Sequence, residues 1–480
     1  MNLPYDPARG KEFWEDIQKI KGYPQDEFMT IKQMIFESDA VYKLPDALRT
    51  AGADPAQALF LVADKTYMHR GEDDLKKMII SILQNAGWHP ELVLMTPDET
   101  GQVHTDMPQI EKVKSRLKRG CGVLSVGSGV VTDIAKHACY LYEKDNGQRL
   151  PFVVFQTANS VSAFTSNMAP TFVGGVKRTL PSRYPDSLIC DLETLRDAPK
   201  EMTVAGVGDM LAAFVSLPDW YLANTLGMDP GYTELPRRLI GPLDEIFLSE
   251  ADNIRCGSQN GMAVLAKVIA LGGLAMSLSH ATTPLSGFEH VMSHVLDLQA
   301  EKGKLPMAPH GTQVALTTLI SVEVYRHFLK EFDPHGIDPD LCYPAAESMQ
   351  KNIEQNYKTI DPTGKAGAEC WSDYRLKLEA WNAQRSSFRE MLADWPTVQA
   401  RLKNDGCSLE TLVEILRKID SPLAWSELNP PIDEARVKFA FLNAPLMRKR
   451  LTIGDLLIFT NWDQERLWRQ IWKRCQALRQ

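Results

Sequence analysis

Three of the chain's ten histidines fall within one short segment, Thr283–Gly311. His290 and His294 are four residues apart, so on a helix they lie on the same face. His310 follows in the sequence "APHG", which we expect to be a loop between a proline and a glycine that directs a side chain into a cleft. Grouped imidazoles can bind a divalent metal or exchange protons, whereas a single histidine is more often structural.

A carboxylate that could complete such a site is Asp209, in "AGVGDMLAAF". We expect Asp209 to open an apolar helix, either as an ordinary N-cap or as a carboxylate directed at a metal. One carboxylate and two imidazoles bind Zn, Ni or Fe(II) and leave positions for substrate and water. Glu289 precedes His290 rather than following it, so the H-E-x-x-H motif of zinc proteases is absent.

A glycine turn, Gly127-Ser128-Gly129, separates an expected strand from an expected helix in "GVLSVGSGVVTDIAK". Such a turn can bring backbone N–H groups and a helix N-terminus to a pyrophosphate, or it can simply be a tight connection. Thr132 occupies the place of the third glycine of the usual dinucleotide motif. Asp64, at the end of an apolar segment, could bind a ribose or merely begin a turn.

These residues require elements to position them, and the first half of the chain alternates between two kinds of segment. Apolar segments of strand length are 31–37, 57–64, 91–97, 122–126 and 151–157. Segments with helical periodicity are 40–52, 74–87, 110–120 and 130–143. This alternation predicts an α/β domain with a parallel, doubly wound sheet, over residues 1–190.

From residue 191 to 480 the periodic segments are mostly helical, which predicts an all-α second domain. Ser408 is a plausible N-cap for the amphipathic segment that follows it. The polar stretch Pro334–Lys403 is expected to form long helices with solvated faces. The most apolar run, Met262–Ala281, contains Lys267 and two glycines, so we expect a buried helix rather than a membrane span.

Composition narrows the class of protein. The 480 residues carry a net charge of −8 with a pI near 5.8, which argues against nucleic acid or an anionic membrane as a partner. Eight cysteines without a C-x-x-C pair predict reduced thiols and a cytoplasmic protein. The N-terminal segment has no apolar core of a secretory signal.

The chain resembles the sn-glycerol-1-phosphate dehydrogenases, within the superfamily of iron-containing alcohol dehydrogenases, glycerol dehydrogenases and dehydroquinate synthases. The matching segments occur in the family's order: "VGSGVVTDIAK", "QTANSVSAFTS", "VKRTLPSRYPDSLICDLETLRDAPKEMTVAGVGDMLA", "SGFEHVMSHVLD", "PHGTQVALTT" and "APLMRKRLTIGDLL".

This resemblance implies an N-terminal NAD(P)-binding domain, a C-terminal metal-binding domain and a site in the cleft between them. It places Asp209, His290 and His310 as metal ligands and His294 as a catalytic histidine beside the substrate. It also implies a set of cofactor-binding positions: Asp64, Gly127, Ser128, Gly129, Val130, Val131, Asp133, Thr157, Ser160 and Ser166. Family members are commonly homodimers or larger assemblies.

The sequence also departs from the family. Ser162 stands where the family usually has an aspartate beside the substrate, which points to a changed substrate. Thr283 replaces an arginine, His280 a small residue, and Val291 a frequent second histidine. Lys177, followed by Arg178, remains as a candidate contact for a substrate phosphate, although a solvated basic pair would look the same.

The resulting hypothesis is a reductase that uses NAD(P)H and one divalent metal (Zn, Ni or Fe) on a small, phosphorylated hydroxyketone. The activity implied by the resemblance is reduction of dihydroxyacetone phosphate to sn-glycerol 1-phosphate, with His294 relaying the proton. The alternatives are a dehydroquinate-synthase-like lyase or cyclase, a dehydrogenase with another carbonyl substrate, and a binding protein that kept the fold without the activity.

Overall fold

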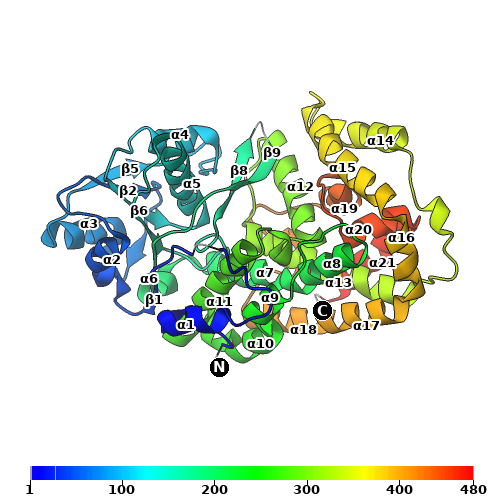
Figure 1. The fold of residues 1–480 in the computed structure, drawn as a ribbon, viewed down its shortest axis with the longest axis horizontal. Coiled ribbons are helices and arrows are strands. Elements are labelled where there is room, and N and C mark those ends of the chain that lie inside the picture. Colours follow the sequence, from blue (N-terminus) through cyan, green and yellow to red (C-terminus); the bar gives the residue numbers. More distant parts are fainter. Residues whose placement is uncertain (1–2, 28, 174–175, 479–480) are drawn as a thin grey trace. The chain divides into compact units, whose positions relative to one another are not determined.

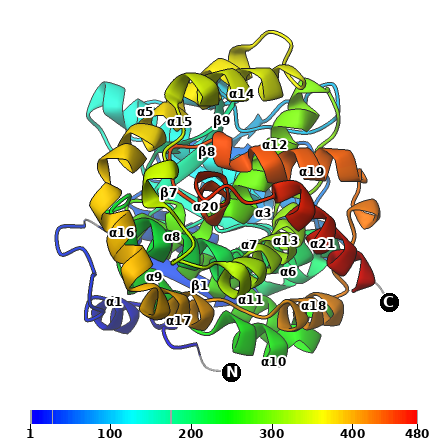
Figure 2. The same ribbon diagram turned by 90° about the vertical axis from the view of Figure 1, so that its right-hand side faces the viewer.

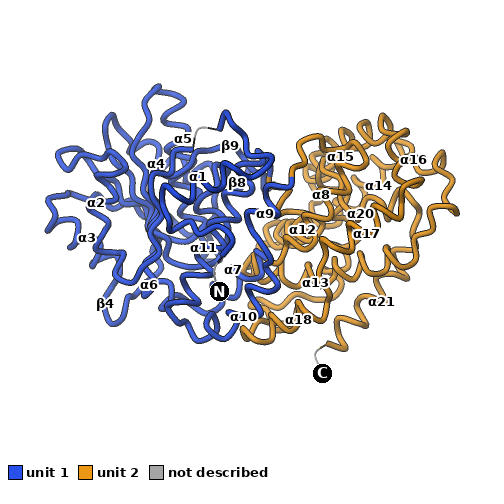
Figure 3. Tube along the Cα trace, turned by 60° about the horizontal axis from the view of Figure 1, so that its bottom comes forward, with its two compact units in different colours: residues 1–210, 234–281 blue, residues 211–233, 282–480 orange. Residues whose placement is uncertain are grey.

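The structure is a computed structural model, and it describes residues 3–27, 29–173 and 176–478. The chain forms two compact units (Figure 3). Unit 1 comprises residues 1–210 and 234–281, and unit 2 comprises residues 211–233 and 282–480. The last strand of the sheet ends at Asp191, close to the predicted change from sheet to helices. Residues 234–281 nevertheless belong to the same unit as the sheet. The predicted domain boundary at residue 190 stays a prediction.

Unit 1 is built on a six-stranded sheet in the order β1-β10-β7-β6-β2-β5. Figure 1 labels β1, β2, β5 and β6 of this sheet. Its strands are β1 (Gln33–Glu37), β2 (Leu59–Ala63), β5 (Pro90–Leu94), β6 (Gly122–Gly127), β7 (Phe152–Gln156) and β10 (Ser187–Asp191). Every pair of neighbours in this sheet is parallel. The predicted doubly wound α/β fold is therefore confirmed.

The chain moves outward to the edge strand β5 and then returns to β6, on the other side of β2. This strand pairs with β5 on one side and with β6 on the other, and Ala63 is opposite Val126. All five residues of β2 are buried, as in a parallel strand covered on both faces. The carboxyl ends of strands at such a reversal are where open α/β sheets bind ligands, and Asp64 and Gly127 both lie there.

The helices of unit 1 connect the strands of the sheet, and further helices follow the last strand, β10, in the sequence. They are η1 (Pro7–Arg9), α1 (Lys11–Ile17), η2 (Ala40–Lys43), α2 (Leu44–Ala51), α3 (Leu75–Asn85), α4 (Met107–Lys114), α5 (Gly129–Asn146), α6 (Leu192–Asp197), α7 (Lys200–Leu211), α9 (Leu235–Ile240), α10 (Leu243–Arg255) and α11 (Gln259–Leu278). Among the described residues, α11 is the one helix long and apolar enough to cross a membrane, but 89% of its apolar window is buried in the protein. The expected buried helix is confirmed.

Four strands lacked a clear signal in the sequence. β3 (His69–Arg70) pairs with β4 (Asp73–Asp74), and β8 (Met168–Val173) pairs with β9 (Val176–Pro181), both in antiparallel ribbons. Strand β10, which lies between β1 and β7, was also not predicted: it has only five residues and α6 follows it directly. All five are buried, so they show no alternation of polar and apolar residues.

Unit 2 is helical throughout its described part (Figure 2). Its helices are α8 (Ala213–Thr225), η3 (Thr283–Leu285), α12 (Phe288–Lys302), α13 (His310–Glu331), η4 (Pro339–Leu341), α14 (Ala346–Lys358), α15 (Lys365–Ala383), α16 (Arg385–Ala393), α17 (Trp395–Asp405), α18 (Leu409–Lys418), η5 (Trp425–Glu427), α19 (Glu434–Asn443), η6 (Ala444–Leu446), α20 (Ile453–Phe459) and α21 (Gln464–Ala477). The predicted N-cap is confirmed, because Ser408 Oγ accepts a hydrogen bond from Thr411 N at 3.0 Å.

A buried ion pair joins α15 to α20. Lys377 Nζ lies 2.6 Å from Asp455 Oδ1, and both side chains are fully buried. Lys377 also donates to the Pro445 carbonyl oxygen, and Asp455 Oδ2 accepts from the backbone N of Thr452 at 2.8 Å. Since a lone buried charge is strongly unfavourable, each partner needs the other.

Replacing one partner should therefore destabilise the fold. We expect Lys377→Ala to lower the free energy of unfolding by about 3–5 kcal/mol, because it leaves the Asp455 carboxylate buried without a cation. Urea denaturation measures this change. The control is Lys418→Ala, which removes an exposed pair with Glu414 and should cost less than about 1 kcal/mol. Equal effects of the two substitutions would contradict the assignment.

Candidate active site

The three histidines of the opening segment gather at the ends of two helices. His290 and His294 lie on α12, as predicted, and the ring centroids of His290, His294 and His310 are 5.3–6.2 Å apart. The expected loop position of His310 is wrong: it is the first residue of α13, after Pro309 as N-cap. A helix start fixes the backbone more firmly than a loop would, and it still directs the side chain.

Neighbouring polar groups fix the orientation of two of these rings. Glu289 Oε1 is 2.9 Å from His290 Nδ1, and Ser293 Oγ is 3.1 Å from His310 Nδ1. In both rings Nε2 is then the nitrogen that faces away from the hydrogen bond. A partner on one ring nitrogen selects the tautomer and presents the other nitrogen to a metal. In the sequence, the only sign of these roles is that Glu289 directly precedes His290 and Ser293 directly precedes His294. The roles of Glu289 and Ser293 were therefore not predicted.

A second buried carboxylate holds the start of α12. Asp219, on α8, accepts hydrogen bonds from Phe288 N at 2.8 Å, Ile453 N at 2.8 Å and the Tyr325 hydroxyl at 2.5 Å. Burial, and then the neighbouring Glu289, raises the pKa of Asp219 to about 8. Asp219 thus connects the beginnings of α12 and α20 to α13, and it fixes the helix that carries His290.

Asp209 lies near the end of α7, so the expectation that it opens a helix is wrong. Its carboxylate oxygen Oδ2 accepts two hydrogen bonds from Ser162, one from the backbone N and one from Oγ, each at 3.0 Å. Gly206, one turn earlier, permits this approach, because a Cβ there would be 2.1 Å from the Asn159 carbonyl oxygen. Gly206 therefore serves the packing of α7 against the segment that carries Ser162.

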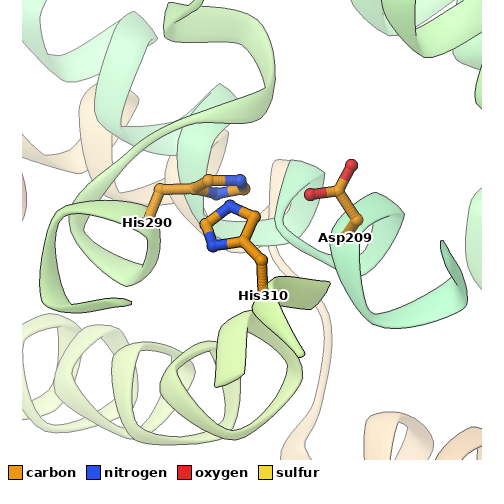
Figure 4. Close-up of side chains that lie close together, drawn as sticks. All are labelled: Asp209, His290 and His310. Carbon is orange, nitrogen blue, oxygen red and sulfur yellow. The ribbon is translucent and has the colours of Figure 1, made fainter. Parts of the chain in front are cut away.

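One ligand atom from each of Asp209, His290 and His310 lies within 4.8 Å of the other two (Figure 4). Asp209 and His290 are buried, and His310 is half-buried. Figure 4 shows the carboxylate and the two imidazoles directed toward a common space. A carboxylate with two imidazoles suits Zn, Ni or Fe(II), so the donor set fits a catalytic metal with open positions.

The glycine turn between β6 and α5 fits a dinucleotide phosphate. A Cβ on Gly127 would be 2.5 Å from Val131 Cβ, and one on Gly129 would be 2.5 Å from Val161 Cγ2. The Ser128 side chain makes no capping hydrogen bond, so it does not occupy the first N–H groups of α5. Both glycines are required by close packing, and the same packing presents the backbone of the turn.

The serine-rich segment 157–166 is fastened to this turn. Thr157 N donates to the Gly127 carbonyl oxygen at 3.2 Å, and the buried Lys136 donates to the Ala163 carbonyl oxygen at 2.9 Å. Lys136 Nζ also lies 2.8 Å from Asp133 Oδ1, which opposes the rise in the pKa of Asp133 caused by burial. The predicted cofactor residues Thr157, Ser160 and Ser166 are all buried here.

Three other residues were predicted to contact the cofactor or the substrate, and each has a different environment in the structure. Asp64 is half-buried and its Oδ1 accepts from Thr66 N at 2.9 Å, which is the hydrogen bond of a turn. Val130, on the first turn of α5, is half-buried. Lys177 lies in β9, opposite Phe172, and its charge acts on Asp133.

Comparison with known proteins identifies the class. A family model described as iron-containing alcohol dehydrogenase matches residues 35–199. Glycerol dehydrogenase from Schizosaccharomyces pombe shares the fold with a TM-score of 0.54 and 12% identity, over 95% of this chain and 93% of that one. A mutant of an archaeal halo-thermophilic alcohol dehydrogenase from a Red Sea brine pool also shares the fold. Its TM-score is 0.53 and its identity 14%, over 94% of this chain and 99% of that one. The fold is that of the iron-containing alcohol dehydrogenase class.

Curated relatives narrow the family further. The chain is 30% identical to the NAD(P)+ glycerol-1-phosphate dehydrogenase of Geobacillus stearothermophilus, over 90% of this chain and 92% of that protein. The Bacillus subtilis enzyme of the same name is 29% identical, over 60% of this chain and 69% of that protein. The chain belongs to the glycerol-1-phosphate dehydrogenase family, whose members are NAD(P)-linked, metal-dependent dehydrogenases.

The raised pKa of Asp219 predicts a pH dependence of stability. An ordinary aspartate in the unfolded chain has a pKa of about 3.9, so between that pH and about 8 the folded state holds one more proton than the unfolded state. The contribution of this group to stability is therefore complete below about pH 4, and it is lost as the pH rises through 8. We expect the wild type to lose stability relative to Asp219→Asn between pH 5 and pH 8.

Urea denaturation at several pH values tests this expectation on metal-free protein. The control is Asp252→Asn, at a side chain that is 80% exposed, and its profile should parallel that of the wild type. If the profiles of the wild type and Asp219→Asn were also parallel, Asp219 would titrate in the same way in the folded and unfolded states.

Proposed function

We propose that this protein reduces dihydroxyacetone phosphate to sn-glycerol 1-phosphate with NAD(P)H and one divalent metal. The observation that carries the proposal is the group formed by Asp209, His290 and His310 in a chain that belongs to the glycerol-1-phosphate dehydrogenase family. A dehydrogenase with another small carbonyl substrate is the alternative, because Ser162 replaces the aspartate expected beside the substrate.

Asp209, His290 and His310 would hold the metal. When bound, the divalent ion polarises a carbonyl oxygen and the nicotinamide supplies a hydride. His294 lies one turn after His290, with ring centroids 6.2 Å apart, and it passes a proton to the substrate oxygen directly or through water. Glu289 and Ser293 keep the ligand rings in place through the reaction.

The residues at the carboxyl ends of β2 and β6 would hold the cofactor. The backbone of Gly127 to Val131 would bind its pyrophosphate at the start of α5, and Asp64 would bind a ribose. Thr157, Ser160 and Ser166 line the cofactor from the serine-rich segment. Asp133 acts indirectly. It pairs with Lys136, and Lys136 connects α5 to the serine-rich segment through its hydrogen bond to the Ala163 carbonyl oxygen.

Lys177 contacts the substrate phosphate, and its position in β9 near Asp133 keeps it beside the cofactor turn. The family resemblance further supports a cytoplasmic homodimer or larger homo-oligomer. The net charge of −8 agrees with a small-molecule substrate rather than a nucleic-acid partner.

The test is a substrate screen on metal-replete protein that follows nicotinamide absorbance. We expect oxidation of NADH or NADPH with dihydroxyacetone phosphate, and Asp209→Ala should lower kcat/KM by at least about 100-fold, because no metal is then held jointly by Asp209, His290 and His310. Asp252→Ala, on an exposed surface, is the matched control. Turnover with no net consumption of the nicotinamide would instead identify a lyase, and no reaction with any small carbonyl would refute the dehydrogenase.

Ser162 gives a separate prediction. Because its hydroxyl donates to Asp209 at 3.0 Å, we expect Ser162→Ala to weaken metal binding by about 10-fold, whereas Ser162→Thr, which keeps a hydroxyl, should retain it. Equilibrium dialysis with Zn²⁺ measures the affinity and steady-state kinetics measure KM. A raised KM with unchanged metal affinity would place Ser162 on the substrate instead.

A further inference from the structure

A second group of metal-ligating side chains lies wholly within unit 2. His294, Asp297 and His310 each offer one ligand atom, and these atoms lie within 4.8 Å of one another. The first two residues are on α12 and the third begins α13. This group therefore has a carboxylate and two imidazoles, as the group with Asp209 has, but draws its carboxylate from α12.

The side chains of this group are held in place. The rings of His294 and His310 are stacked, with centroids 5.5 Å apart and planes 8° apart. Asp297 is 3% exposed, and its Oδ1 accepts a hydrogen bond from Gln313 Nε2 at 3.1 Å. Gln313 is itself fixed through a hydrogen bond to the Ala308 carbonyl oxygen at 2.9 Å. The carboxylate is thus buried with a set orientation beside the histidines.

The alternative role for Asp297 is to orient His310 by a hydrogen bond. Asp297 Oδ2 is 3.9 Å from His310 Nδ1, which is too long for a hydrogen bond, and Ser293 Oγ already lies 3.1 Å from that nitrogen. Two atoms bound to one ion by bonds of about 2.0–2.2 Å lie about 3–4 Å apart. The separation between Asp297 and His310 is therefore suited to a shared ion.

His310 belongs to both groups, so the two positions exclude each other. A neutral imidazole carries a proton on one nitrogen and can give only the other to a metal. In one arrangement Ser293 is the partner of Nδ1 and Nε2 binds the ion with Asp209 and His290. In the other, Nδ1, which lies 3.9 Å from Asp297 Oδ2, binds the ion in place of its contact with Ser293, and Asp297 supplies the carboxylate.

We propose that His294, Asp297 and His310 form a second position for the divalent metal, alternative to the one with Asp209. Its ligands suit Zn²⁺, Co²⁺, Ni²⁺ or Fe²⁺. The position retains an ion in unit 2 when Asp209 does not bind it. The inference rests on the proposed function only in taking the group with Asp209 as the primary metal position.

The experiment uses the full chain, freed of metal by chelation and titrated with Co²⁺. Equilibrium dialysis gives the stoichiometry and affinity, and the visible absorption of bound Co²⁺ reports the ligand environment. In Asp209→Ala we expect about one Co²⁺ per chain, at lower affinity than in the wild type and with a changed spectrum. Absence of Co²⁺ binding by this variant would overturn the proposal.

The decisive comparison adds a second substitution to Asp209→Ala. His294→Ala or Asp297→Asn should weaken the residual Co²⁺ binding by about 10- to 100-fold, and His290→Ala should leave it unchanged. Weakening by His290→Ala would show that the remaining ligands of the primary position hold the ion, and it would overturn the proposal. Insensitivity to His294→Ala would do the same.

Two controls keep these outcomes clear. With Asp209 intact, His294→Ala should retain tight Co²⁺ binding, which shows that the variant folds and that the primary position survives. Failure of the proposed function appears elsewhere, as absence of nicotinamide turnover in the wild type, so the two inferences fail independently.

Discussion

The geometry of the helical unit depends on one buried carboxylate. Asp219 receives hydrogen bonds from the first residues of α12 and α20 and from Tyr325 of α13, so three helices are fixed at one point. Such a group is tolerated in a protein interior only when its oxygens are satisfied. His290 and His294 lie within the first two turns of α12 after Phe288, so their positions follow from this contact.

In the sheet-containing unit the corresponding constraint is steric. Gly206 of α7 and Gly273 of α11 both press against the segment that carries Ser162, and a Cβ at either position would meet a backbone oxygen at 2.1 Å or 2.7 Å. At the turn into α5, a Cβ on Gly127 or Gly129 would be 2.5 Å from a valine side chain, that of Val131 or Val161. Asp209 and the cofactor turn are therefore both placed by contacts that only glycine allows.

The sequence predicted the features that have a regular period or a compact motif. The strands and helices up to α5 alternate clearly, and His290 and His294 are spaced for one helix face. It did not predict what depends on distant contacts. The N–H groups that Asp219 accepts come from segments 69 and 234 residues further along the chain. The sequence predicted Asp209 at a helix start because it follows a glycine and precedes apolar residues, whereas it lies near the end of α7.

The hydrogen bonds between Ser162 and Asp209 have a consequence for reactivity. Ser162 donates two hydrogen bonds to one oxygen of Asp209, from its backbone N and from its Oγ. In the proposed metal site these bonds would fix the orientation of the carboxylate, and they would also withdraw some electron density from the ligand oxygen. A metal held there firmly, but by a weaker donor, would be a stronger Lewis acid, suited to carbonyl groups that are harder to polarise.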